Sequence, residues 1–400
     1  MRIVLVSQEY PPARHGGIGA QNYQKAQGLG KCGHEIIVVT HSELGLSMES
    51  QEGRVRVIRV GCDVDRFPIL SEEVRWLTYS LRVAETLHEL SLQLQIDVVE
   101  FPEWGGEGYV HLLNRLETNR IPVVLQLHGP LVMFAHELEW PDRNSEFFRV
   151  GTHMESTCVR LADAVYSSSQ CSVEWCRNHY GLKQQDVPVL HTGVDPNIFC
   201  PGLNAKEERP TIIFVGKLVE NKGVLELAEA AKNLVSEFPD LQVWMFGKGE
   251  PAIIERLNAI AGQLQRADFL QLRGFISRDA LPQMLNQAHV FAAPSVYEGG
   301  PGFVYLEAMS CALPVIACSG SGVSEIIKTE ETGFLVPPKD VGALTEVLRR
   351  LLSDASLRNS SGMRAREYVL TETNSEACLK RLEKFYESVI ARNKQSRLLP

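Results

Sequence analysis

The sequence has no CxxC pair and no apolar run of membrane-spanning length, and each absence excludes a class of protein. Its nine cysteines are scattered, so a zinc ribbon or a thioredoxin-type dithiol is unsupported. We expect them to be small buried hydrophobic residues in a reducing compartment. No stretch approaches the roughly 20 apolar residues of a transmembrane helix, and the run at residues 1–6 is too short for a signal-peptide core. These features predict a cytoplasmic or at most peripheral protein.

The chain also lacks the basic excess of a nucleic-acid-binding protein. It carries 40 Lys and Arg residues against 49 Asp and Glu residues. Residues 1–200 hold 17 basic and 25 acidic residues, and residues 201–400 hold 23 and 24. A nucleic-acid-binding domain usually has an excess of positive charge, and anionic lipid also attracts basic surfaces. We therefore expect no nucleic acid as a partner, and the charge does not indicate contact with a membrane.

Short β-type segments alternate with helical patterns throughout the chain, which is typical of α/β proteins. The predicted strands are continuous Val, Ile and Leu runs, as expected for strands covered on both faces. They lie at residues 3–7, 35–40, 54–60, 97–101, 123–127, 164–167, 187–190, 211–215, 241–246, 269–272, 290–293 and 314–317. Turn-forming and charged residues between 192 and 210 predict a linker. We therefore predict two doubly wound, Rossmann-like domains, residues 1–200 and 201–374, that face each other across a cleft.

Two loops of the first half have residues suited to ligand binding. Ligands of doubly wound sheets bind outside the carboxyl ends of the strands. Gly16 and Gly17 follow the first strand and open a helix, where backbone N–H groups can approach an anion. This loop is not a GxGxxG motif, and a tight turn explains it equally well. His128 follows the strand at 123–127, although a single histidine is more often a capping or core residue.

A third loop, after the strand at 211–215, holds two lysines. Lys217 and Lys222 stand between Gly216 and Gly223, and two cations on one loop can converge on a diphosphate. Exposed lysines more often belong to a solvated turn, but the two framing glycines favour a binding function.

A fourth loop combines two kinds of binding group. Glu298 precedes a glycine-rich loop that includes Gly300 and Gly302. Phe303 then opens a helix, which carries Glu307. The free N–H groups of such a loop suit a phosphate, and the two carboxylates can accept hydrogen bonds from paired hydroxyls on a sugar or a ribose. A turn followed by a helix is the simpler alternative, but it does not account for both kinds of group in one loop.

At this loop the sequence resembles family 4 of the retaining glycosyltransferases, which have the two-domain GT-B fold. The resemblance covers nearly the whole chain and depends on several motifs together. They are Gly16-Gly17, residues 192–199, Gly216-Lys217 with Lys222-Gly223, the segment from Glu298 to Glu307, residues 314–317 and residues 332–336. Two features depart from the family pattern. Lys217 stands where the family usually has Arg, and Glu298 and Glu307 are nine residues apart instead of eight.

The resemblance implies that the second domain binds a nucleotide-diphosphate sugar, with UDP or GDP as the common nucleotides. It implies that Lys217 and Lys222 bind the diphosphate, that Glu298 binds the sugar hydroxyls and that Glu307 binds the ribose. His128 is implied near the reacting carbon, and Gly16 and Gly17 near the phosphates. The residues implied around the leaving group are Gly216, Gly300, Gly302 and Phe303. The loop with Glu103 and Trp104 and the segment 136–140 are expected on the acceptor side. As in other GT-B proteins, the last helix, within 375–400, is expected to pack back on the first domain.

The activity that the resemblance implies is retaining transfer of a hexose to an unidentified acceptor hydroxyl, in glycan or glycoconjugate biosynthesis. No cofactor or metal is expected. Asp63 and Asp65 are spaced like the DxD metal motif of another glycosyltransferase fold, but a polar turn after a strand is the preferred interpretation. Two alternatives stay open. A GT-B-fold sugar-nucleotide epimerase would turn over without an acceptor, and a non-catalytic sugar-nucleotide-binding subunit would be expected to have lost donor residues.

Overall fold

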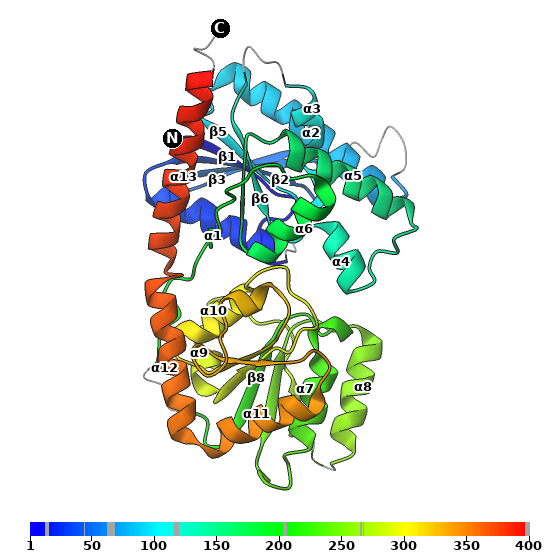
Figure 1. Ribbon diagram of the computed structural model, residues 1–400, viewed down its shortest axis with the longest axis vertical. Coiled ribbons are helices and arrows are strands. Elements are labelled where there is room, and N and C mark those ends of the chain that lie inside the picture. Colours follow the sequence, from blue (N-terminus) through cyan, green and yellow to red (C-terminus); the bar gives the residue numbers. More distant parts are fainter. Residues whose placement is uncertain are drawn as a thin grey trace. The chain divides into compact units, whose positions relative to one another are not determined.

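The computed structural model describes residues 1–12, 16–43, 45–61, 69–115, 120–202, 206–264, 266 and 268–396, with the side chain of Ser396 excepted. The chain divides into two compact units (Figure 1). Unit 1 comprises Met1–Thr192 with Glu376–Pro400, and unit 2 comprises Gly193–Ser375. The division falls after Thr192 and not at residue 200, because the backbone of Val194 bonds to Thr373 (2.9 Å) and to Ser375 (3.0 Å) within unit 2.

Unit 1 contains a seven-stranded sheet of order β3-β4-β2-β1-β5-β6-β7. Its strands are β1 (Arg2–Val6), β2 (Glu35–His41), β3 (Met48–Glu52), β4 (Val55–Val60), β5 (Val98–Pro102), β6 (Val123–Leu127) and β7 (Ala164–Ser167). All neighbours pair in parallel except β3, which is antiparallel to β4. The predicted strand at 187–190 is wrong, because only Val189 forms an isolated bridge, to Ser167.

Helices cover both faces of this sheet. They are α1 (Gly17–Lys31), α2 (Glu72–Gln93), α3 (Tyr109–Leu113), α4 (Leu131–Glu137), α5 (Glu146–Leu161), α6 (Gln170–Tyr180) and α13 (Ser375–Ser396), with a short 3-10 helix, η1 (Trp104–Gly106). Because side chains alternate along a strand, Val4 and Val6 of β1 pack in the core with α2, α5 and α6. Ile3 and Leu5 pack with α1 and with Leu379, Leu382, Tyr386 and Val389 of α13. Figure 1 shows α13 in red beside the sheet.

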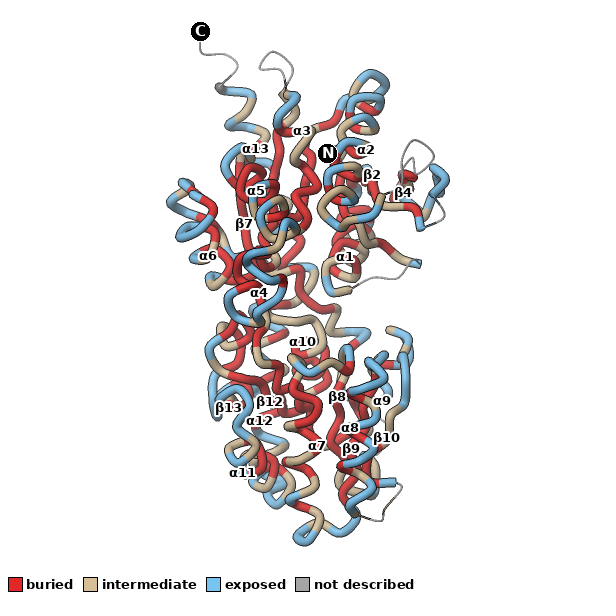
Figure 2. Tube along the Cα trace, turned by 90° about the vertical axis from the view of Figure 1, so that its right-hand side faces the viewer, coloured by how far each residue is buried: buried red, intermediate tan, exposed pale blue. Residues whose placement is uncertain are grey.

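Unit 2 contains a parallel six-stranded sheet of order β10-β9-β8-β11-β12-β13. Its strands are β8 (Thr211–Val215), β9 (Gln242–Phe246), β10 (Leu270–Leu272), β11 (Val290–Ala292), β12 (Val315–Cys318) and β13 (Phe334–Val336). Its helices are η3 (Glu220–Lys222), α7 (Val224–Lys232), α8 (Pro251–Gly262), α9 (Leu281–Gln287), α10 (Phe303–Ser310), η4 (Gly322–Glu325), α11 (Val341–Ser353) and α12 (Ala355–Thr371). Buried residues follow the strands of each sheet except the exposed edge strand β3 (Figure 2).

The predicted fold class, two doubly wound parallel α/β units, is confirmed. In unit 2 the strand order reverses between β8 and β11, and in unit 1 it reverses between β1 and β5. Such reversal points are where doubly wound sheets form ligand crevices. The loops that follow these strands contain most of the predicted site residues. Among the described residues, no helix combines the length and apolarity that crossing a lipid bilayer requires.

Candidate functional site

Two predicted residues of unit 2 meet at the reversal point of its sheet. Lys222 ends the η3 turn in the loop after β8, and Glu298 lies in the loop after β11. Nζ of Lys222 is 2.5 Å from Oε1 of Glu298, with side chains that are 29% and 18% exposed. A half-buried cation and carboxylate therefore stand together where the topology predicts a ligand.

Close backbone packing holds these two loops against each other. Gly223 has φ = 67°, and a Cβ at this position would lie 2.0 Å from the carbonyl oxygen of Pro294. Only glycine combines this left-handed conformation with so close an approach. The N–H of Val296 also donates to the carbonyl of Asn221 (2.8 Å). The position of Lys222 relative to Glu298 is therefore set by the backbone as well as by their ion pair.

The glycine-rich loop leads into α10 as predicted. Gly302 is its N-cap residue, and no side chain in the described part of the chain caps it. A hydrogen bond from η4 anchors the loop, because the N–H of Gly322 donates to the carbonyl of Glu298 (2.8 Å). The first N–H groups of α10 point out of the N-terminal end of the helix, where the helix dipole favours an anion.

Glu307 of α10 is buried and has a partner that the sequence analysis missed. Its side chain is 2% exposed, and its Oε1 lies 2.7 Å from Nη2 of Arg278. Burial raises the pKa of the Glu307 carboxyl, and the nearby Arg278 opposes that shift. The guanidinium of Arg278 also lies 5.3 Å from the ring centre of Phe199 and 5.8 Å from that of Phe303. Only its place in the loop after β10, at the same edge of the sheet, could have indicated Arg278.

Lys217 and Gly216 follow β8 directly. Lys217 is exposed and forms no ion pair with the acidic residues that the structure describes. The N–H of Gly216 donates to the carbonyl of Phe246 in β9 (2.9 Å), and a Cβ on Gly247 would lie 1.7 Å from the carbonyl oxygen of Gly216. The two strands thus fix the start of the lysine loop, from which Lys217 extends into solvent.

In unit 1 the predicted anion loop contacts a carboxylate. The N–H of Gly16, the N-cap residue of α1, donates to Oε2 of Glu9 (2.6 Å). A Cβ at Gly16 would lie 3.2 Å from the same oxygen, whereas Gly17 has open space around it. Glu9, which the sequence analysis did not single out, therefore binds the N–H group that was predicted to approach a phosphate.

His128 is held in place through its backbone by Glu103. The Glu103 carboxylate is fully buried and accepts hydrogen bonds from the N–H of His128 (2.7 Å) and from that of Gly129. Burial raises the pKa of the Glu103 carboxyl to about 7, although these hydrogen bonds oppose the shift. The Glu103 carboxylate therefore faces the protein backbone, and its predicted place on the acceptor side stays a prediction. Burial, with Lys25 nearby, holds the pKa of His128 well below its usual value, so its imidazole is neutral at pH 7.

Two more buried glutamates fasten the surrounding loops. Glu155 accepts hydrogen bonds from the N–H of Leu131 (2.8 Å), the N–H of Gly105 (3.2 Å) and the hydroxyl of Tyr180 (2.6 Å). Glu107 accepts from the N–H of Gln8 (2.8 Å). Burial raises the pKa of both carboxyls to about 8. These contacts join the segments after β1, β5 and β6 into one framework.

Trp104, the other predicted acceptor-side residue, belongs to an aromatic cluster. Its ring centre lies 5.6 Å from that of Trp76, 5.5 Å from that of Phe134 and 6.4 Å from that of Trp140. Trp76 is buried, whereas Trp140 is 54% exposed. The cluster therefore extends from the core to the surface beside the loop that carries Glu103.

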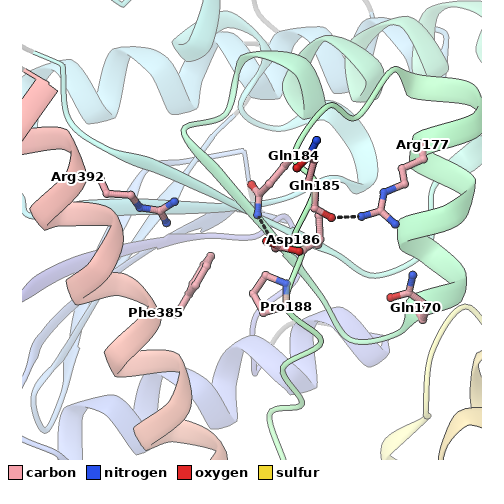
Figure 3. Close-up of a pocket in the computed structure, with 9 residues that line it drawn as sticks. Gln170, Arg177, Gln184, Gln185, Asp186, Pro188, Phe385 and Arg392 are labelled. Carbon is pink, nitrogen blue, oxygen red and sulfur yellow. Dashed lines mark hydrogen bonds between the residues drawn. The ribbon is translucent and has the colours of Figure 1, made fainter.

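A cavity of about 520 Å³ lies elsewhere on unit 1, between α6, residues 184–188 and α13 (Figure 3). Arg392 and Phe385 reach it from α13, and Arg177 lies on its α6 side, where it donates to the carbonyl of Gln185. Its lining includes none of the predicted site residues. In the described part of the chain, no three His, Cys, Asp or Glu side chains are grouped to hold a metal ion. Asp63 and Asp65 lie outside the described residues.

Two doubly wound units with charged and glycine-rich loops at their reversal points define a class of two-domain, Rossmann-like proteins. Residues 15–198 match the family model described as Glycosyltransferase Family 4, and residues 200–368 match that described as Glycosyl transferases group 1. The chain is 31% identical over 283 residues to alpha-D-kanosaminyltransferase of Streptomyces kanamyceticus. The aligned residues cover 67% of this chain and 72% of that protein. It therefore belongs to the GT-B glycosyltransferase family, and glycosyl transfer is its activity.

Two further comparisons extend over nearly the whole chain. The GDP-mannose-dependent alpha-(1-6)-phosphatidylinositol monomannoside mannosyltransferase of Mycolicibacterium smegmatis is 28% identical over 393 residues, which cover 92% of this chain and 94% of that protein. The structure of sucrose-phosphate synthase from Thermosynechococcus elongatus superposes with a TM-score of 0.82 at 22% identity, covering 98% and 99% of the two chains. At that identity the superposition shows the fold alone.

Proposed function

We propose that the protein transfers a hexose from a nucleotide-diphosphate sugar, of the UDP or GDP type, to an acceptor hydroxyl with retention of the anomeric configuration. The observation that carries this proposal is the contact between Lys222 and Glu298 at the reversal point of the unit 2 sheet. A diphosphate requires a cation and a sugar requires hydrogen-bond acceptors, and these two groups lie side by side. The relative named as GDP-mannose-dependent also supports a donor of this class.

Donor binding, in this proposal, replaces the Lys222–Glu298 contact with two others. Lys222 and Lys217 bind the diphosphate, and the first N–H groups of α10, beside Gly300, Gly302 and Phe303, add partial positive charge. Glu298 then accepts hydrogen bonds from the sugar hydroxyls. Glu307 accepts hydrogen bonds from the ribose in place of its contact with Arg278, so both carboxylates exchange a protein partner for a substrate.

In the chemical step the bond between the anomeric carbon and the diphosphate oxygen breaks, and a bond from the acceptor oxygen forms on the same face of the sugar. The acceptor proton passes to the leaving diphosphate. Negative charge on that group grows as its bond breaks, so a preformed cation stabilises the transition state more than the bound donor. Lys222, Lys217 and the start of α10 supply this charge, and the proposed reaction therefore needs no metal ion.

For His128 we propose a hydrogen bond to a sugar hydroxyl. A neutral imidazole can donate to or accept from a hydroxyl without adding charge near the reacting carbon. Nε2 of His128 is buried and has no hydrogen-bond partner among the described residues; in this proposal a sugar hydroxyl supplies that partner. Glu103 acts through His128 by holding its backbone N–H.

The test is a panel of donors with a direct product readout. The protein is incubated with UDP-glucose or GDP-mannose and a mixture of mono- and oligosaccharide acceptors, and products are followed by mass spectrometry and ¹H NMR. The proposal predicts acceptor-dependent release of UDP or GDP and a product with the anomeric configuration of the donor. An inverted product would contradict the retaining mechanism. Sugar-nucleotide interconversion without an acceptor would instead identify an epimerase.

A further inference from the structure

The indole of Trp140 is exposed beside the site loops although it is large and apolar. It is 54% exposed, and its plane lies at 20° to that of Trp104, with 6.4 Å between ring centres. Phe147, at 6.1 Å, supports it from α5. A single exposed apolar residue is ordinary, but a contiguous apolar patch with a polar rim is typical of a binding site. The patch formed by Trp104, Trp140 and Phe147 is called the aromatic surface below.

The backbone around Trp140 is held in a fixed turn. Glu139 has φ = 55°, a left-handed conformation that is strained for a residue with a side chain and that occurs often at ligand-binding sites. Asp142 accepts from the N–H of Asn144 (2.9 Å), and the Ser145 hydroxyl accepts from the N–H of Phe148 (3.1 Å) to cap α5. The indole is therefore presented to solvent by an ordered turn, so little conformational entropy is lost when a ligand binds there.

The aromatic surface adjoins the segments that carry the predicted site residues of unit 1. Trp104 follows Glu103, which binds the backbone of His128. Trp104 also packs edge-on against Phe134 of α4, the helix that follows His128. Through Trp104, the indole of Trp140 therefore lies next to the loop whose Glu103 fixes the backbone of His128.

The charge around Trp140 selects the kind of molecule. Residues 136–149 contain four carboxylates, on Glu137, Glu139, Asp142 and Glu146, and two guanidiniums, on Arg143 and Arg149, all of them exposed. Arg149 pairs with Glu146, and the segment keeps an excess of negative charge. Such a rim repels phosphates and other anions, whereas carboxylates accept hydrogen bonds from hydroxyls or amines. The C–H faces of a pyranose ring carry partial positive charge and suit the negative face of an indole. An aromatic surface with a rim of acceptors therefore fits a neutral or amino sugar.

We propose that the aromatic surface binds the acceptor, and that the acceptor is a neutral or amino-sugar glycan with a pyranose stacked on Trp140. The proposal rests on the proposed function, because it assigns the acceptor of that reaction. It excludes an acceptor held at this surface through a phosphate or a carboxylate.

The test begins with the wild-type protein on a glycan array that contains neutral, amino, sialylated and phosphorylated saccharides. We expect binding to a subset of the neutral or amino saccharides. For a saccharide that binds, Trp140→Ala should weaken affinity about tenfold or more, as expected for loss of an aromatic stacking contact, while Trp140→Phe stays within about threefold. Leu92→Ala, at another exposed apolar residue (74% exposed), serves as the control and should bind normally.

Donor binding is measured on the same variants by the thermal shift that UDP-glucose or GDP-mannose produces. Trp140→Ala should keep the wild-type shift while it loses saccharide binding. An array on which nothing binds, on which only acidic glycans bind, or on which Trp140→Ala binds like wild type would overturn the proposal. If Trp140 is needed for saccharide binding but no donor shifts the wild-type protein, the proposed function fails and the saccharide site remains.

Discussion

Nζ of Lys222 lies 2.5 Å from Oε1 of Glu298, although the two residues are 76 positions apart in the chain. Lys222 follows β8 and Glu298 follows β11. These two strands are neighbours, and the strand order of the sheet reverses between them. Their contact is therefore a consequence of topology. It places a cation beside a carboxylate that can accept hydrogen bonds from hydroxyls, at the edge where a doubly wound sheet binds its ligand.

Replacing Lys222 with alanine should reduce turnover more than it weakens donor binding. Charge on the leaving diphosphate grows as its bond breaks, so the lost cation matters most in the transition state. We expect kcat to fall by about two orders of magnitude or more, the usual effect of removing one such electrostatic contact. Steady-state kinetics with the active donor measure this.

The matched control for Lys222 is Lys232→Ala. Lys232 lies on α7 of the same unit and pairs with Glu229 one turn away. Its loss should leave kcat unchanged. Normal turnover by Lys222→Ala would show that the leaving group is stabilised by other residues.

Replacing Arg278 with alanine should destabilise the protein in a pH-dependent way. The change leaves the buried Glu307 carboxylate without its cation, at a cost of about 1–3 kcal/mol. Burial already raises the pKa of Glu307, and without Arg278 it rises further. A raised carboxyl pKa in the folded state means that stability is lost as the pH rises through that pKa. Arg278→Ala should therefore lose more stability at pH 8 than at pH 5 in urea unfolding.

The double variant Arg278→Ala, Glu307→Gln distinguishes this cause from loss of the aromatic contacts of Arg278. A neutral amide at position 307 needs no cation, so the double variant should recover most of the loss at pH 8. A double variant as unstable as Arg278→Ala at pH 8 would assign the loss to packing against Phe199 and Phe303.

Replacing Glu155 with glutamine should make stability less dependent on pH. Burial raises the pKa of Glu155 to about 8, so the folded protein holds this proton between about pH 5 and pH 8 while the unfolded chain releases it. The wild type therefore loses stability over this range, by at most about 1.4 kcal/mol per pH unit from this group. Thermal unfolding from pH 5 to pH 9 should show a flatter profile for Glu155→Gln. Glu146→Gln, at the exposed start of the same helix, should keep the wild-type slope.

Chelation of divalent cations should leave transfer unchanged. Two lysines and the start of α10 supply the positive charge that the leaving diphosphate needs in the proposed mechanism. Activity measured in EDTA should equal that measured without it. Loss on chelation with recovery in Mn²⁺ or Mg²⁺ would instead point to a metal ion, with Asp63 and Asp65 as its first candidate ligands.

The central strands were predictable because strands buried on both faces are continuous apolar runs. The edge strand β3 was not, since its sequence, Met-Glu-Ser-Gln-Glu, is polar and mostly exposed. Residues 187–190 have a strand-like sequence, but only Val189 bridges β7. The apolar pattern of a segment indicates whether that segment is buried, but it does not reveal which strand the segment pairs with.

The loops of the candidate site were predictable from glycines, lysines and glutamates at the ends of strands. Their partners were not. Arg278 reaches Glu307 from the loop after β10, and Glu9 accepts a hydrogen bond from the N–H of Gly16. Glu103 belongs to the expected loop, yet it turns inward to the backbone of His128. These contacts depend on how separate loops pack together, which no local pattern in the sequence contains.

The measurement that tests the account most directly is titration of Glu298→Ala with the intact donor and with the matching nucleotide diphosphate. Glu298 is proposed to bind the sugar and now pairs with Lys222. Its loss should weaken binding of the sugar nucleotide, while UDP or GDP alone binds as well as before or more tightly, because Lys222 is released. Glu220→Ala, at an exposed carboxylate of the same lysine loop, should change neither affinity. Equal weakening of both ligands by Glu298→Ala would contradict the account.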